Sequence, residues 1–191
     1  MVKYARILKG GQDMQRQGIL RLVISALCLA LGYSLPFLTG QIPQIGTMLL
    51  PMHIPVLLCG FICGWKWGLG VGVICPILRS LTLGSPIFFP MAVCMALELG
   101  AYGAISGICH RLLPKRRFFI YISLLISMLI GRIIWGVSMA VCMGVKGGSF
   151  TFGAFIAGAF TNSIIGIIIQ IVLIPILVIA LEGSRVMKSN E

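Results

Sequence analysis

The feature that most constrains this chain is a succession of long apolar runs with almost no charge inside them. Residues 118–130 and 164–181, for example, contain no acidic or basic side chain. A helix needs roughly 20 apolar residues to cross a membrane, so a chain of 191 residues accommodates about six such helices after loops and tails. The strands of a transmembrane barrel would show short alternating segments instead. We therefore predict an all-α integral membrane protein with six transmembrane helices.

Breaks rich in Gly, Pro or basic residues separate the runs. With 10% charged and 59% hydrophobic residues, the chain lacks the charge that a soluble domain of this length needs on its surface. We predict a cytoplasmic tail over residues 1–18, a membrane domain over 19–181 and a second cytoplasmic tail over 182–191. The six apolar runs cover residues 19–38, 48–64, 67–83, 87–109, 118–143 and 150–181.

The basic residues decide the predicted orientation. If the N-terminus is cytoplasmic, all 15 of them except Arg79, Arg132 and Lys146 fall on the cytoplasmic side. This asymmetry is typical of the positive-inside rule and predicts a multi-pass protein of the cell membrane with both termini cytoplasmic. The same distribution argues against nucleic-acid binding as the reason for the net charge of +11, because the cations sit at the ends of apolar runs.

Several kinds of chemistry lack their sequence signals. The chain contains no phosphate-binding loop of the form G-x-x-x-x-G-K-[ST], no H-E-x-x-H and no G-x-S-x-G. The seven cysteines are scattered; Cys59 and Cys63 lie one turn apart, which is weak evidence for a metal. We expect no enzymatic activity, no cofactor and no metal.

Polar side chains inside the apolar runs are few and therefore informative, because each costs free energy in a membrane. At about 1.5 Å of rise per residue, Arg79, Glu98, Arg132 and Asn162 fall in the outer half of four different helices. We predict that they line an outward-opening pocket. Two arginines against one glutamate, with Lys146 in an outer loop, favour an anionic ligand such as a carboxylate. A structural ion pair of Glu98 with an arginine is the alternative.

The loop after the first run extends this predicted pocket. Gln41 and Gln44 lie in a Gly- and Pro-rich stretch that His53 follows, and irregular backbone at membrane depth is tolerated where it lines a cavity. A plain connecting loop and a structural histidine are the alternatives. Tyr102 and Trp135 lie one turn from Glu98 and Arg132, so each either stacks on a ligand or packs in the core.

Small residues repeat at a spacing of four. Ala26 and Ala30 form such a pair, as do Gly103 and Gly107, and three more follow at Gly60, Gly64 and Gly68. Such faces let helices approach closely, either within the protein or toward a partner.

Three stretches, together with size and predicted topology, resemble a known family. They are residues 44–60 (QIGTMLLPMHIPVLLCG), 76–80 (PILRS) and 131–136 (GRIIWG). Over residues 18–181 the chain resembles the substrate-binding subunits, or S-components, of energy-coupling factor (ECF) vitamin transporters. The pair Ala26 and Ala30 is similar to the A-x-x-x-A contact that this family makes with its coupling subunit.

The resemblance implies a mechanism. The subunit would bind a vitamin or precursor from outside in a pocket closed by its first, third and fifth loops. It would dock through its first three helices on a transmembrane coupling subunit driven by two ATPases, and topple to release the solute inside. Within the family, the positive surplus fits pantothenate best; pyridoxine-like vitamins, a queuosine precursor and folate remain open.

Two other classes of function stay as alternatives. A stand-alone small-solute carrier or channel is less favoured because no internal repeat is evident. An integral membrane enzyme using Glu98 and His53 is less favoured because these residues have no recognisable catalytic spacing.

Overall fold

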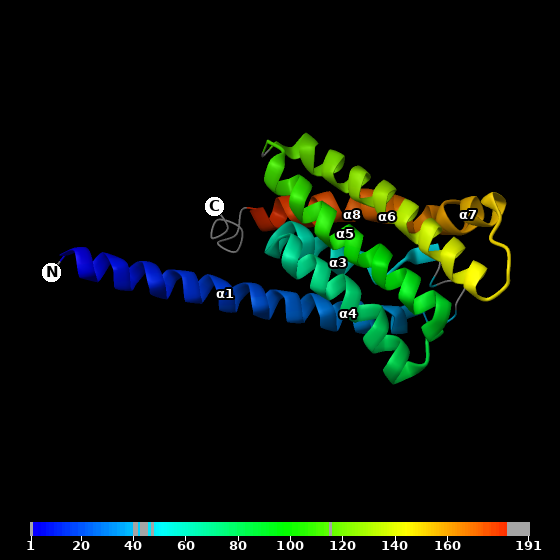
Figure 1. Ribbon diagram of the computed structural model, residues 1–191. Helices are drawn as coiled ribbons and strands as arrows, with labels where there is room; N and C mark the ends of the chain where they lie inside the picture. Colours follow the sequence, from blue (N-terminus) through cyan, green and yellow to red (C-terminus); the bar gives the residue numbers. More distant parts are fainter. Residues whose placement is uncertain (1, 40–41, 43–45, 47, 115, 183–191) are drawn as a thin grey trace.

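The computed structural model describes residues 2–39, 42, 46, 48–114 and 116–182, with side chains from Gln15 onward. Every regular element in these residues is helical (Figure 1). The elements are α1 (Val2–Ser34), η1 (Leu35–Thr39), α3 (His53–Cys63), α4 (Trp65–Leu83), η2 (Phe88–Ala92), α5 (Val93–Leu112), α6 (Arg117–Val145), α7 (Phe152–Ala159), η3 (Thr161–Ser163) and α8 (Ile164–Glu182).

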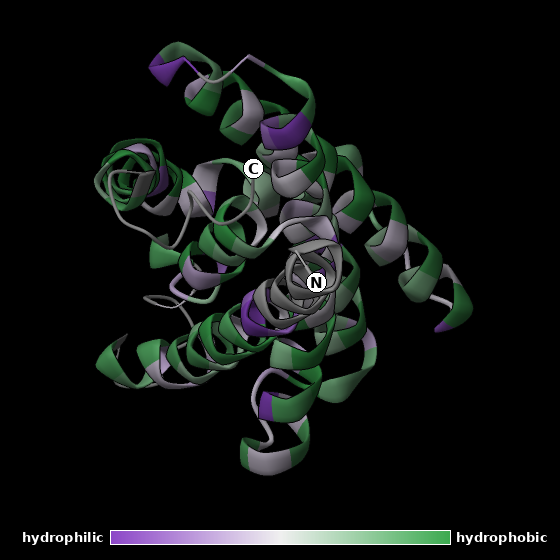
Figure 2. Cartoon of the chain, turned by 90° about the vertical axis from the view of Figure 1, so that its left-hand side faces the viewer, coloured by the Kyte–Doolittle hydropathy of each residue, from purple (hydrophilic) through white to green (hydrophobic). Residues whose placement is uncertain are grey.

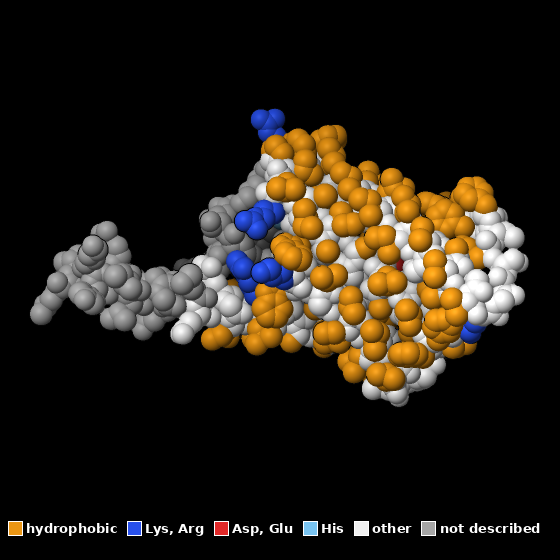
Figure 3. Space-filling model, viewed as in Figure 1, with side chains coloured by type: hydrophobic (Ala, Val, Ile, Leu, Met, Phe, Trp, Pro, Cys, Tyr) orange, Lys and Arg blue, Asp and Glu red, His pale blue; other side chains and the backbone are white. Residues whose placement is uncertain are grey.

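The bundle is apolar on its outside, as a membrane requires. Viewed end-on, most of the helical ribbon has the colour of hydrophobic residues, and hydrophilic stretches are short (Figure 2). In side view they cover the visible flank, while Lys and Arg gather near the end from which α1 protrudes (Figure 3). Four stretches are long and apolar enough to cross a membrane: Gln15–Leu38, Phe88–Leu112, Arg117–Val145 and Phe152–Leu181. An even coat of apolar side chains is expected where lipid replaces water.

The six predicted runs all contain helices, but three differ from the prediction in extent. The first helix begins at Val2, well before residue 19. The second is interrupted: Met48 and Leu49 are helical, Leu50 is not, and α3 begins at His53. The 11 residues of α3 extend about 16 Å, roughly half of a hydrocarbon core. The sixth is interrupted at Phe160, whose φ of −125° and ψ of −59° separate α7 from α8.

Glycines join α3, α4 and α5 at backbone contact. A methyl group on Gly68 would lie 2.5 Å from the Gly103 carbonyl oxygen, and one on Gly107 would lie 2.5 Å from the Trp65 nitrogen. Only residues without a Cβ allow this approach. The small-residue spacing that the sequence left open between internal packing and a partner thus serves internal packing here. We call this contact the glycine seam; its members are Gly60, Gly68, Gly72, Gly103 and Gly107.

Four helices of the bundle enclose one hydrophobic cluster, which we call the apolar layer. Its buried members come from α3, α5, α6 and α8 and are Leu57, Phe61, Tyr102, Ile120, Leu124, Met128, Ile174 and Val178. By contrast, α1 is peripheral: 17% of its most apolar stretch is buried, against 44% for the spans of α5 and α6. The apolar layer therefore borders the side chains that lie one helical turn further along these four helices.

Candidate functional site

One polar side chain follows the apolar layer on each of the four helices. Each lies four residues, one helical turn, from a member of the apolar layer and on the side away from the basic α5–α6 turn. Each is at most 5% exposed. We call this group the polar layer; its members, with their apolar neighbours, are His53 (Leu57), Glu98 (Tyr102), Arg132 (Met128) and Gln170 (Ile174).

Glu98 is the centre of the contacts within the polar layer. Its Oε1 atom lies 3.2 Å from Arg132 Nη1 and 3.5 Å from His53 Nε2. The Tyr102 hydroxyl donates a hydrogen bond of 3.1 Å to the same oxygen. The depths estimated from sequence put Glu98 and Arg132 in the outer half of the membrane, and the structure brings them into contact.

Part of the polar layer has no partner among the described residues. Arg132 leaves Nε and Nη2 without a hydrogen bond, His53 leaves Nδ1, and both polar atoms of the Gln170 amide are unpaired. Nε and Nη2 lie on the same edge of a guanidinium group, the edge that grips a carboxylate with two parallel hydrogen bonds. Buried polar groups are normally paired in native structures, so an unpaired group points to a role beyond packing.

Local sequence explains how the polar layer is held. An added Cβ at Gly131 would collide with the Tyr102 ring, so glycine there lets the tyrosine lie against α6 beside Arg132. Gly166 plays the same part on α8, because a Cβ there would lie 2.7 Å from the Met48 carbonyl oxygen. The backbone just before α3 therefore rests on α8, one turn from Gln170. Leu50 in this stretch has a φ of +50°, a conformation that costs a leucine free energy and is typical of functional sites.

Arg79 makes a different set of contacts from those of the polar layer. The side chain is 3% exposed, its Nη1 donates 2.8 Å to the Tyr33 carbonyl oxygen, and its guanidinium lies 5.1 Å from the centre of the Phe37 ring. Tyr33 also contacts Thr82 of α4, with 3.1 Å between the two hydroxyl oxygens. Arg79 thus joins α4 to the end of α1 and to η1, and no ion pair to Glu98 is formed.

The remaining predicted site residues lie nearer the loops. Trp135 packs with Phe150 and Phe155 at 5.9 and 6.4 Å between ring centres. Lys146 is exposed and donates 3.2 Å to the Phe89 carbonyl oxygen. Asn162 is exposed in η3, because the break at Phe160 moves it off the buried face that a continuous helix would have given it. Gln41 and Gln44 lie outside the described residues.

Ala26 and Ala30 are both exposed on α1. They lie among exposed apolar side chains such as Val23 and Leu27, while Ser25 and Cys28 turn toward the bundle. This face is open to lipid or to a partner helix, and the predicted contact stays a prediction.

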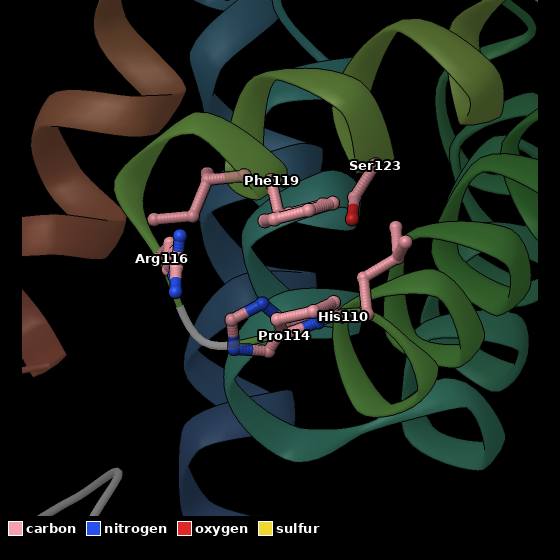
Figure 4. Close-up of a pocket in the computed structure, with 7 residues that line it drawn as sticks. His110, Pro114, Arg116, Phe119 and Ser123 are labelled. Carbon is pink, nitrogen blue, oxygen red and sulfur yellow. The ribbon is translucent and has the colours of Figure 1, made fainter.

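A small hollow lies at the other end of the bundle, at the turn between α5 and α6 (Figure 4). Its lining includes His110, Arg116 and the buried Ser123. Leu124 and Met128 of the apolar layer stand between Ser123 and Arg132 on α6. The hollow is therefore separate from the polar layer. Among the described residues, no group of three or more His, Cys, Asp or Glu side chains has the arrangement of a metal site.

Polar side chains buried inside a helical membrane bundle are typical of proteins that bind or move a solute within the membrane. The family model of the ECF transporter, substrate-specific component, matches residues 20–178, so the chain belongs to this family. It is a multi-pass membrane protein and the substrate-binding component of an ECF transporter, a transport subunit and not an enzyme. No curated protein and no solved structure matches the chain.

Besides lacking several predicted residues, the polar layer contains one residue that was not predicted. Gln170 is visible in the sequence as a polar residue in an apolar run, yet it was not predicted to belong to the pocket. No sequence signal selects its face, because α8 is apolar on all sides; the structure shows that Gln170 shares a buried face with Gly166, Ile174 and Val178.

Proposed function

We propose that this chain captures a water-soluble vitamin or vitamin precursor bearing a carboxylate, with pantothenate favoured, from outside the cell. The observation that carries the proposal is the Nε and Nη2 edge of Arg132, which has no hydrogen-bond partner in the described part of the chain and belongs to a side chain that is 5% exposed. A carboxylate satisfies both donors at once in this geometry. Leaving a buried charged donor unpaired costs about 1–3 kcal/mol or more, and the ligand carboxylate offsets that cost.

The charges around the polar layer support binding of an anion at the Nε and Nη2 edge of Arg132. Within the polar layer Glu98 balances Arg132, and Arg79 makes its contacts elsewhere. The attraction for a carboxylate therefore comes from two directed donors and not from a general positive surplus. The first turn of α3, which begins at His53, adds the positive end of a helix dipole at the same level.

The depth of the polar layer supports access from outside. Arg132 lies about 22 Å along α6 from Arg117, and Glu98 lies about 21 Å along α5 from Leu112. Both distances are measured from the basic α5–α6 turn, which the positive-inside rule assigns to the cytoplasm. In this orientation, with both termini cytoplasmic, the polar layer falls in the outer half of the membrane.

We further propose that the transport partners are a transmembrane coupling subunit and two ATPase subunits, with Ala26 and Ala30 at the contact with the coupling subunit. The exposure of both alanines on the least buried spanning helix supports this. Two small residues one turn apart let a partner helix approach closely.

Binding of pantothenate by the purified protein tests the proposal. Isothermal titration of wild-type protein should give saturable binding, and Arg132→Gln should weaken it by more than about tenfold, which is 1.4 kcal/mol. Arg116→Gln removes an exposed arginine at the other end of the bundle and should leave the affinity unchanged. Equal affinities of wild type and Arg132→Gln would contradict the proposed carboxylate contact.

A further inference from the structure

Gln170 is the most unusual side chain in α8. The helix is otherwise apolar from Ile164 to Leu181, and its glutamine is 1% exposed on the face that packs toward α3 and α6. Its neighbours on that face, Ile174 and Val178, are completely buried hydrophobic residues. A leucine or methionine at residue 170 would continue this face without burying an amide.

The amide of Gln170 has no hydrogen-bond partner among the described residues, for either its oxygen or its nitrogen. A glutamine with a structural role would use its amide to join helices or to satisfy a nearby backbone group. An unpaired carboxamide has one acceptor and one donor group to offer. The Gln170 amide would therefore be satisfied by a partner group that both donates and accepts hydrogen bonds, such as an amide or a hydroxyl.

Gln170 and the open edge of Arg132 belong to the same level of the bundle. Their neighbours one turn away, Ile174 and Met128, are both members of the apolar layer, and α6 packs against α8. Arg132 offers donors only, whereas Gln170 offers a donor and an acceptor. The two groups thus fit two different parts of one molecule.

We propose that Gln170 is a substrate-binding residue that recognises a neutral amide or hydroxyl group of the same ligand whose carboxylate binds Arg132. This inference rests on the proposed function and narrows the ligand class. A carboxylate whose other end only accepts hydrogen bonds, or is apolar, leaves half of the glutamine amide unpaired. A ligand with a carboxylate at one end and an amide or hydroxyl group at the other satisfies both side chains.

Two probes separate the roles of Gln170 and Arg132. Pantothenate carries a carboxylate, an amide and hydroxyl groups; panthenol keeps the amide and the hydroxyls but has a hydroxymethyl group in place of the carboxylate. Gln170→Leu should weaken the binding of both probes by the same factor, more than tenfold. Arg132→Gln should weaken pantothenate and leave panthenol unchanged. Ile168→Leu, an exposed position on the opposite side of α8, is the control and should change neither.

Thermal unfolding of the ligand-free protein gives a second, independent result. Because the Gln170 amide is unpaired, Gln170→Leu should leave the melting temperature unchanged or raise it. Gln170→Met, which is closer in shape, serves if the leucine variant does not fold. A melting temperature lowered by several degrees in both variants would mean a structural glutamine and would overturn the inference. So would unchanged affinity for both probes, or a loss confined to pantothenate.

Failure of the proposed function looks different from failure of this inference. If wild-type protein binds neither probe, the pantothenate proposal fails. The inference is then judged on the small molecules that mass spectrometry finds in denatured wild type and Gln170→Leu. A solute recovered from wild type and lost from the variant supports the role of Gln170, and equal recovery, or none from either, overturns it.

Discussion

The glycine seam and the polar layer are two contact regions of the same bundle that differ in what makes the contact. In the glycine seam, backbone meets backbone with no room for a single methyl group. In the polar layer, side chains of α3, α5 and α6 meet around Glu98, and several polar atoms of the layer have no partner among the described residues. The difference indicates that the seam serves packing, whereas the function proposed above assigns the open hydrogen-bonding groups of the polar layer to a ligand.

The largest effect on stability is expected where the polar layer does have a partner. Glu98→Leu leaves the Arg132 charge buried without its carboxylate and should destabilise the protein by about 3–5 kcal/mol. Adding Arg132→Leu to the same chain should restore most of that stability, because no charge remains unpaired. Thermal unfolding in detergent measures both, and a double variant less stable than Glu98→Leu would contradict this view.

Within the glycine seam, Gly103→Ala should cost about 1–3 kcal/mol or more, because the new Cβ meets the backbone of Gly68, which cannot move aside. Gly70→Ala is the matched control on α4: nothing lies within 4 Å of its Cβ, and stability should hold or rise slightly. Melting temperatures of the two variants test the seam. Equal values would mean that the close approach contributes nothing.

A smaller effect is expected where a glycine faces a side chain. Gly131→Ala pushes the Tyr102 ring away from α6, and the loss of its hydrogen bond to Glu98 should cost about 1 kcal/mol. Because Tyr102 supports the polar layer, pantothenate affinity should fall as well. Calorimetry on Gly131→Ala and Tyr102→Phe should give similar losses; a loss only in the alanine variant would assign the effect to backbone displacement.

The smallest effect on the isolated chain is expected at the exposed face of α1. Ala26→Trp should leave stability and pantothenate binding unchanged, because the side chain points away from the bundle. Assembly with the coupling subunit should be blocked, since the indole keeps a partner helix at a distance. Co-purification from membranes measures this, and normal recovery of the complex would remove Ala26 from the contact.

The sequence predicted the helical membrane fold and most of the helix positions, because long apolar runs have few other solutions. Depth along a helix could also be estimated, which is why Glu98 and Arg132 were both placed in the outer half of the membrane. Direction around the helix could not, because helices that are apolar on all sides give no periodic signal. Arg79 accordingly turned out to contact Tyr33, and Gln170 was missed. Asn162 is exposed because the helix breaks at Phe160, and this break could not be predicted, since Phe160 is neither a proline nor a glycine.

Capture of a carboxylate by the Arg132 edge can be tested by mass spectrometry of small molecules released from purified, denatured protein, with wild type and Arg132→Gln prepared in parallel. We expect a carboxylate-bearing vitamin or precursor in near-stoichiometric amount from wild type and its loss from the variant. A neutral solute recovered equally from both proteins would contradict the role of the Arg132 edge and, with it, the proposed class of substrate.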